Sequence, residues 1–408
     1  MNTAASDIIN YCSFCLKTRE QVAKLIVSDS VGICNECVEC CVQLLDNKHQ
    51  PQSTANLDSK SESSIDPARL KKYLDQYVIG QDDAKIMLSV AIANHYKRIS
   101  CQDPDQNISK ANILMLGPTG SGKTLLAKTV ADYLDVPFAI GDATSITESG
   151  YVGDDVESLI SRLLQSANGD IEKTQKGIVF IDEIDKIGRK SESASITRDV
   201  SGEGVQQALL KLVEGTRCRV PAVQGRKHPA GEMIEIDTTD ILFIAGGAFV
   251  GIDNIIKTRK HGTAMGFSAD VGLGDMQTQE SDVTPDDLIK FGMIPEFVGR
   301  FPNWVKLKQL EKTDLVKILT QVKNNLIDQY QWLLAQDQIE LSFHDEAIDQ
   351  IVKNTLLHGT GARGLQSEIE RVLIPHMFNV YQYRDHNIKS LTIDLELVNN
   401  PQPLKEIT

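Results

Sequence analysis

The sequence has no apolar run that approaches the roughly 18 residues of a membrane-spanning helix. Its first residues, Met1 to Asp7, have neither the basic start nor the apolar core of a secretory signal peptide. Basic residues are also in the minority, because 42 Lys and Arg stand against 56 Asp and Glu and give a net charge of −14. Loose binding to nucleic-acid backbones requires clustered Lys and Arg. These absences predict a cytoplasmic protein without a membrane or nucleic-acid partner.

Cysteine, by contrast, is well represented, with eight residues. In a cytoplasmic protein such residues are more often metal ligands or free thiols than disulfides. Four of them form two C-x₂-C pairs separated by eighteen residues, a spacing typical of zinc sites. Four thiolates close a tetrahedral site and leave no position open, which is typical of structural zinc. We therefore predict that Zn²⁺ is bound by Cys12, Cys15, Cys34 and Cys37.

Two alternatives to this zinc assignment exist. Cys37-x₂-Cys40 is a second possible knuckle, although Gly32 just before Cys34 suits a knuckle turn and favours the first choice. Cys40 and Cys41 would then be packed or free on a following helix. A redox-active dithiol pair is the alternative to metal binding.

A phosphate-binding pattern, G-x-x-x-x-G-K-[ST], follows the apolar run of residues 113–116. A helical pattern comes next, so strand, glycine loop and helix succeed one another. Backbone N–H groups in such a loop turn inward, and the helix N-terminus favours negative charge. Lys123 would reach the β- and γ-phosphates of ATP, and Thr124 would ligate Mg²⁺. A glycine-rich turn with a chance lysine is the alternative. The predicted phosphate-binding residues are Gly117, Pro118, Thr119, Gly120, Ser121, Gly122, Lys123 and Thr124.

A second strand, residues 178–181, ends in two acids, Asp182 and Glu183. This is the Walker B arrangement. Asp182 would hold Mg²⁺ through water, and Glu183 would polarise the attacking water. Two solvated acids at a strand end are the alternative. The next apolar run, residues 241–245, is followed by Gly246-Gly-Ala248, which has no polar side chain where a sensor residue would sit, so no sensor residue is assigned.

These motifs together resemble those of the AAA+ ATPases, and further segments resemble the ClpX family of protein unfoldases over about residues 11–380. Gly150-Tyr-Val-Gly153 is similar to a pore loop, Gly299-Arg300 to an arginine-finger segment, and Gly361-Ala-Arg-Gly-Leu365 to a sensor 2 motif. The four-cysteine module, Arg226-Lys-His228 and Met265-Gly-Phe267 complete the set.

The resemblance implies an α/β fold: an AAA+ large domain with a parallel sheet between helices, then a small, mostly helical α+β domain. A treble-clef-like zinc domain would precede them. Strand-like stretches near residues 339–343 and 390–395 belong to the small domain, and residues 46–65 nearly lack apolar side chains. The expected domains are a zinc-binding domain at 1–49, a flexible linker at 50–64, the large ATPase domain at 65–308 and the small domain at 309–408.

The resemblance also implies a function. A homohexamer would recognise tagged proteins, with adaptor proteins, and would unfold and translocate them through its pore into the ClpP peptidase. ATP and Mg²⁺ would drive this, and the peptidase would cut the peptide bonds. The zinc domain would dimerise and recognise substrates or adaptors.

Roles within the ATPase cycle follow from the same resemblance. Arg300 would stabilise transition-state charge on the γ-phosphate bound by a neighbouring subunit. Arg363, at a helix start, would contact nucleotide in its own chain. Val78 and Ile79 would pack around the adenine. The plainer readings are a surface salt bridge for Arg300, a solvated side chain for Arg363 and core packing for Ile79.

The substrate-handling residues are implied likewise. Tyr151 and Val152 would grip a polypeptide in the pore, unless the tyrosine folds back onto its own domain. A basic cluster in an acidic chain, Arg226, Lys227 and His228, would attract acidic substrates at the entrance, unless it is only a solvated charge run.

Peptidase docking would fall to Met265, Gly266 and Phe267, unless this loop tucks its apolar residues into the body. Met265 replaces the more usual Ile or Leu, with a compatible volume. Two other functions compete with a peptidase-coupled unfoldase. One is a peptidase-independent remodeller of protein complexes, which has no use for this tripeptide. The other is a nucleic-acid motor, which the net charge disfavours.

Overall fold

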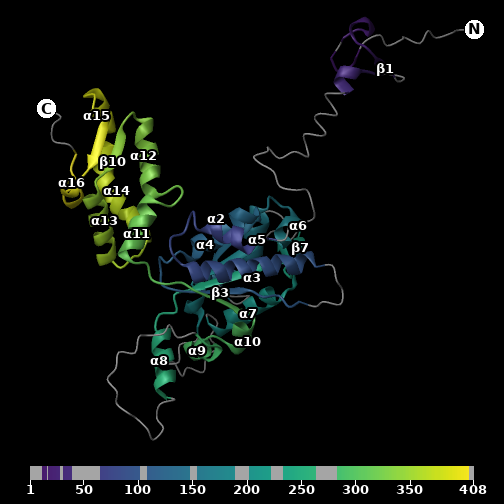
Figure 1. Ribbon diagram of the computed structural model, residues 1–408. Coiled ribbons are helices and arrows are strands. Elements are labelled where there is room, and N and C mark those ends of the chain that lie inside the picture. Colours follow the sequence, from purple (N-terminus) through teal and green to yellow (C-terminus); the bar gives the residue numbers. More distant parts are fainter. Residues whose placement is uncertain are drawn as a thin grey trace, which may run out of the picture. The chain divides into compact units, whose positions relative to one another are not determined.

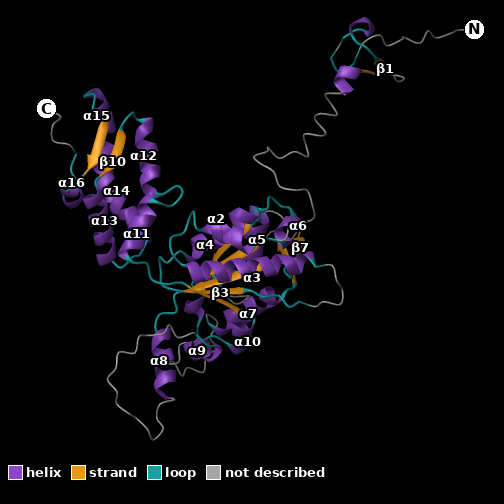
Figure 2. Cartoon of the chain, in the orientation of Figure 1, coloured by secondary structure: helices purple, strands orange, loops and turns teal. Residues whose placement is uncertain are grey.

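The structure, a computed structural model, describes residues 12–15, 17–27, 31–38, 65–101, 108–147, 154–188, 202–221, 233–262 and 283–403. The chain forms two compact units, Met1–Ser63 and Ser64–Thr408. Figure 1 and Figure 2 show the elements of both units. The domain boundaries expected from the sequence remain predictions.

The first unit is built from very short elements. A 3₁₀ turn, η1 (Arg19–Gln21), precedes an antiparallel pair of strands, β1 (Leu25–Val27) and β2 (Gly32–Cys34). Several of its apolar side chains, Phe14, Ile26 and Val31 among them, are more than half exposed. A module with so little apolar burial needs another source of folding free energy, and a bound metal would supply it.

The second unit contains a five-stranded parallel sheet in the order β4-β5-β8-β3-β9. Its apolar central strands are buried because helices cover both faces. The α/β fold class with a parallel sheet is therefore confirmed. The strands are β3 (Ile113–Leu116), β4 (Phe138–Asp142), β5 (Ile178–Asp182), β8 (Leu242–Gly247) and β9 (Asn303–Lys306).

Alternate residues of the strands belong to two separate apolar cores. Ile113 and Met115 pack with the helices of one face, α2 (Pro67–Leu74), α3 (Asp82–Ser100) and α4 (Lys123–Leu134). Leu114 and Leu116 pack on the other face. This alternation is the period-two pattern of a strand, and it gives three layers.

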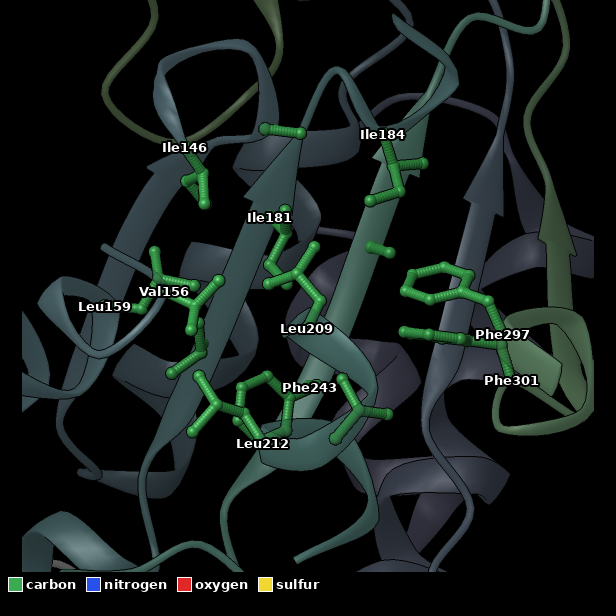
Figure 3. Packing of buried hydrophobic residues seen from close by; sticks show 14 of the residues in the cluster. Ile146, Val156, Leu159, Ile181, Ile184, Leu209, Leu212, Phe243, Phe297 and Phe301 are labelled. Carbon is green, nitrogen blue, oxygen red and sulfur yellow. The ribbon is translucent and has the colours of Figure 1, made fainter. Parts of the chain in front are cut away.

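The second face carries the remaining elements of this part of the chain. Figure 3 shows Ile181, Leu209 and Phe243 meeting in its core. A hairpin-like antiparallel pair, β6 (Arg217–Pro221) and β7 (Met233–Asp237), adds to this face. Its helices and turns are η3 (Ala143–Ser145), α5 (Ser158–Ser166), α6 (Ile171–Gln175), η4 (Ile184–Ile187), α7 (Glu203–Glu214), α8 (Ile252–Gly262), α9 (Pro285–Phe291) and α10 (Pro295–Gly299).

Residues from Lys312 onward have a core of their own. Two strands, β10 (Glu340–Phe343) and β11 (Ser390–Ile393), pair in parallel where the sequence predicts strands. Helices surround them, which confirms a mostly helical α+β domain. These helices are α11 (Lys312–Thr320), α12 (Leu326–Gln336), α13 (Asp345–Leu357), α14 (Arg363–Phe378), α15 (Val380–Asp385) and α16 (Leu395–Asn399). Among the described residues, no helix is both long and apolar enough to cross a bilayer.

Candidate functional site

The glycines of the phosphate-binding pattern have identifiable structural reasons. Gly120 and Gly122 have φ angles of +79° and +99°, in the left-handed region that side chains disfavour. At Gly117 a Cβ atom would lie 2.8 Å from the carbonyl oxygen of Leu307, so no side chain fits there. The loop between β3 and α4 therefore has the backbone that a phosphate cradle requires.

Lys123, the first residue of α4, lies almost buried inside this loop, with 8% of its surface exposed. Its Nζ atom donates to the carbonyl oxygens of Gly117 and Pro118 at 2.6 and 3.0 Å. Burial lowers the pKa of Lys123, and nearby Asp182 and Asp185 oppose that shift. The ammonium is thus held at the loop, ready to exchange carbonyl partners for phosphate oxygens.

The ends of β5 and β3 bring the two nucleotide motifs together. The hydroxyl of Thr124 donates to Oδ2 of Asp182 at 3.3 Å, although 58 residues separate them. Oδ1 of Asp182 accepts the backbone N–H of Glu183 at 3.0 Å. Glu183 itself is exposed and has a φ of 55°, a strained conformation of the kind that clusters at functional sites.

These residues fit a Mg²⁺-bound nucleotide. A hydroxyl and a carboxylate within bonding distance of each other are the hard oxygen donors that Mg²⁺ prefers. The buried hydroxyl of Ser121 has no hydrogen-bond partner within the described parts of the chain, so a phosphate oxygen would satisfy it. Thr124 and Asp182 thus offer oxygen ligands for a metal ion, and Ser121 offers an unsatisfied donor for a phosphate oxygen.

The end of β8 leaves no room for side chains at its two glycines. A Cβ at Gly246 would lie 2.7 Å from Cζ of Phe180, and one at Gly247 would lie 2.8 Å from Oδ1 of Asp185. That carboxylate instead accepts the N–H of Ala248 at 3.1 Å. A buried acid of the neighbouring η4 turn therefore lies where a larger side chain of β8 would be.

Arg363 begins α14, just after a turn that touches the phosphate-binding loop. A Cβ at Gly120 would lie 2.9 Å from the carbonyl oxygen of Thr360, and one at Gly361 would lie 3.1 Å from that of Thr119. The charge of Arg363 is close enough to lower the pKa of Lys123. The structure thus places this arginine beside the loop of its own chain.

Val78 is also close to the phosphate-binding loop. It is 5% exposed, and a Cβ at Gly122 would lie 3.9 Å from its Cγ1 atom. The neighbouring Ile79 is half-buried, so part of its surface is left to contact a ligand. Core packing and adenine contact are therefore both compatible with this pair.

The four cysteines of the first unit form a compact donor set. Their Sγ atoms all lie within 4.8 Å of one another. Cys12 and Cys37 are 3.8 Å apart and Cys15 and Cys34 are 3.6 Å apart, close to the ~3.8 Å that tetrahedral Zn–S bonds of ~2.3 Å impose. The backbone N–H of Cys34 donates to Sγ of Cys12, and the backbone N–H of Cys37 donates to Sγ of Cys34. The set fits Zn²⁺.

Family models match three successive parts of the chain. A ClpX C4-type zinc finger matches residues 10–47, and an AAA domain of the Cdc48 subfamily matches residues 108–304. The C-terminal, D2-small domain of ClpB protein matches residues 310–390.

A curated relative extends this likeness over almost the whole chain. The ATP-dependent Clp protease ATP-binding subunit ClpX of Treponema denticola is 49% identical over 397 residues, which cover 95% of this chain and 94% of the relative. The chain belongs to the ClpX family. As a ClpX-family protein it is an ATPase, and its cofactors are ATP, Mg²⁺ and Zn²⁺.

Arg300, the predicted arginine finger, lies away from the phosphate-binding loop of its own chain. Its carbonyl oxygen accepts Nδ2 of Asn112 at 3.0 Å. Asn112 lies just before β3, and the phosphate-binding loop lies just after β3. The four residues of this strand, which span about 13 Å, therefore separate Asn112 from the loop. The guanidinium binds Glu214 at the end of α7, with Nε and Nη2 at 2.8 and 2.7 Å from Oε1. A surface ion pair, the plainer reading, is therefore present within the chain.

The ClpX-family loops that would handle substrate and peptidase fall outside the described residues. The residues predicted to line the pore, to form its entrance and to dock on the peptidase are therefore not described. The two cysteines that follow Cys37 are not described either. Their roles remain predictions, for Tyr151, Val152, Arg226, Lys227, His228, Met265, Gly266, Phe267, Cys40 and Cys41.

Several residues that hold the site were not found from the sequence. Lys85, Asn112 and Asp185 are buried polar side chains, and Gln81 and Glu214 bond partners far away in the chain. Only Lys85 could have been found from the sequence, because it is a charged residue on the apolar face of a predicted helix. Hydrogen bonds between residues 63 or more positions apart, as at Asp185, leave no local pattern.

Proposed function

We propose that this chain is an ATP-dependent unfoldase that recognises tagged proteins, unfolds them and translocates them through the pore of a homohexamer into the ClpP peptidase. The observation that carries the proposal is the 3.3 Å contact between Thr124 and Asp182, with Lys123 beside it, in a ClpX-family chain. The relative's name, an ATP-binding subunit of a protease, supports a division of labour in which the partner cuts peptide bonds. The place of action is the cytoplasm.

Bound Mg²⁺–ATP supplies a phosphoanhydride whose γ-phosphoryl group passes to water. The residues of this chain prepare that step. Lys123 would pair with the phosphates, and Thr124 and Asp182 would hold the metal ion. Glu183 would orient the water and accept its proton, since it directly follows Asp182 and is exposed.

Two arginines would act on the nucleotide, one from the same chain and one from a neighbouring subunit. Arg363 contacts it within the same chain, which its effect on Lys123 supports. Arg300 acts on the nucleotide of a neighbouring subunit. Its position beyond the far end of β3 supports action in trans, because its own loop is about 13 Å of strand away.

The remaining roles rest on the likeness to the ClpX family. Val78 and Ile79 contact the adenine. Tyr151 and Val152 grip the polypeptide in the pore. The basic cluster at residues 226–228 attracts substrates at the entrance, and residues 265–267 dock on ClpP. The zinc domain dimerises and binds adaptors or substrates.

The substitution Glu183→Gln tests the ATPase part of the proposal. The variant should bind ATP and assemble as the parent does, yet turn over at least about a hundredfold more slowly, because it lacks a general base. ATP binding and steady-state hydrolysis are the measurements. Glu172→Gln, on exposed α6, is the control and should hydrolyse normally. Normal turnover in Glu183→Gln removes that residue as the base.

A peptidase-independent remodeller is the second candidate function. The observation that favours it is Met265, because the first docking position usually carries Ile or Leu. Degradation of a tagged fluorescent protein by this chain with ClpP, compared with Met265→Ala, separates the two. Unfolding without degradation in the parent supports the remodeller.

A further inference from the structure

The side chain of Gln81 forms a two-point bridge to a distant peptide group. Its Nε2 donates to the carbonyl oxygen of Lys308, and its Oε1 accepts the N–H of the same residue, both at 2.8 Å. The two residues are 227 positions apart in the chain. Lys308 follows the end of β9 and is the last residue of the expected large domain. The bridge thus ends where the chain passes from one domain to the next.

The conformation of Gln81 is strained for this arrangement. It has a φ of 59° and follows Gly80, whose φ is 63°. Gln81 is also the N-cap of α3, yet its side chain makes no capping bond. N-cap side chains usually accept an N–H of the helix. Gln81 is therefore a non-glycine residue in the left-handed region, and its side chain bonds Lys308 instead of capping the helix. Backbone strain of this kind is often found at functional sites.

The segment before Gln81 is held as well. The carbonyl oxygen of Val78 accepts Nζ of Lys85 at 2.6 Å, and this buried ammonium also binds Asp75. The carbonyl oxygen of Gln76 accepts the N–H of Lys323, which lies between α11 and α12, at 2.8 Å. Residues 76–81 are therefore bonded to α3, to the end of β9 and to the small domain.

We propose that Gln81 is a positioning residue that couples the adenine-contacting segment to the chain entering the small domain. When Val78 and Ile79 shift on binding or losing nucleotide, the paired amide carries the shift to Lys308. This inference rests on the proposed contact of Val78 and Ile79 with adenine. Both backbone groups of Lys308 can bond to water once the bridge is lost, so the fold survives without it.

The first experiment compares Gln81→Met with Asp83→Asn in the full chain. Methionine keeps the length and removes both hydrogen bonds. Asp83 contacts the same Lys308 through an exposed ion pair at 3.7 Å, so it is a matched control. The readouts are ATP affinity, ATPase rate and the ATP consumed per tagged fluorescent protein unfolded.

Gln81→Met should keep its ATP affinity within about twofold and consume about fivefold or more ATP per unfolded protein. Asp83→Asn should match the parent. Gln81→Glu keeps the acceptor for the Lys308 N–H and should fall between them. If Gln81→Met consumes as much ATP per unfolded protein as the parent, the proposal is overturned. A variant that only binds ATP more weakly also overturns it.

Hydrogen exchange separates this inference from the unfoldase proposal, because it needs no protein substrate. In the parent, a non-hydrolysable ATP analogue should slow exchange over residues 76–81 and 305–310. Gln81→Met should keep the first response and lose the second. A second response that persists in Gln81→Met, or is absent from the parent, overturns the coupling role. A parent that shows both responses but unfolds nothing contradicts the unfoldase proposal alone.

Discussion

At the residue scale, the buried side chain of Asn112 forms hydrogen bonds to the backbone of three distant segments of the ATPase domain. Asn112 is 1% exposed and donates to the carbonyl oxygens of Arg300 and Val213 at 3.0 and 3.4 Å. Its Oδ1 accepts the N–H of Phe243 at 3.3 Å. One amide therefore joins the backbone of Arg300 to Val213, the residue before Glu214, and to β8.

Replacing Asn112 with Ala should destabilise the protein and disturb the placement of Arg300. Buried backbone groups would lose their partners, which costs about 2 kcal/mol or more of unfolding free energy. Urea unfolding and ATPase rates measure the two effects. The control is Asn254→Ala at an exposed position of α8. An unchanged unfolding midpoint in Asn112→Ala would show that these bonds do not matter.

His95 makes stability depend on pH. It is 4% exposed, and its Nε2 lies 3.1 Å from the carbonyl oxygen of Asp240. Burial, with the charges of Arg98 and Lys110, lowers its pKa to about 3. The folded chain thus binds fewer protons than the unfolded chain between pH 3 and about 6.5, and stability falls as the pH falls through that window.

His95→Gln should therefore lose less stability on acidification than the parent. The contribution of His95 between pH 7 and 5 is about 2 kcal/mol, from the unfolded pKa of about 6.5. Urea unfolding at the two pH values gives the difference. His386→Gln, at an exposed position, should behave as the parent. Equal acid sensitivity in His95→Gln and the parent contradicts a neutral buried imidazole.

At the scale of elements, the phosphate-binding loop is set by its glycines. Gly120→Ala introduces a Cβ at positive φ, 2.9 Å from the carbonyl oxygen of Thr360. The loop must shift, and the strain of about 1–2 kcal/mol should weaken ATP binding about tenfold. Nucleotide titration measures this. Gly169→Ala is the matched control, because its φ is also positive, +84°, with nothing within 4 Å. Equal ATP affinity in both variants would mean that the crowding at Gly120 is harmless.

The sequence predicts the central elements better than the edges. Continuous apolar runs identify β3, β5 and β8, since strands buried on both faces carry no alternation. No such run marks β4, whose burial alternates, or β9, which has one buried residue. The motifs identify Lys123 and Asp182 because their spacing is local. The hydrogen bonds of Asn112 and Gln81 were not predicted, because their partners are brought near only by the folded sheet.

At the scale of the whole molecule, the zinc unit and the ATPase unit are expected to be separable. Cys34→Ser removes one of four sulfur donors, so residues 12–38 should lose zinc and their fold. The unit Ser64–Thr408 has its own cores and should keep its ATPase activity. Zinc content and ATP turnover per chain are the measurements, with Cys101→Ser as the control. Truncation of residues 1–60 should likewise spare hydrolysis and narrow the range of substrates. Loss of hydrolysis in either variant contradicts this separation.

The central claim is that ATP hydrolysis by this chain drives proteins into a peptidase. The most direct measurement is the ATP-dependent loss of fluorescence from a stably folded fluorescent protein with a C-terminal degradation tag, in the presence of ClpP. Tyr151→Ala and Met265→Ala serve beside the parent. The account predicts loss with the parent and none with either variant. Steady fluorescence with a parent that still hydrolyses ATP would contradict it.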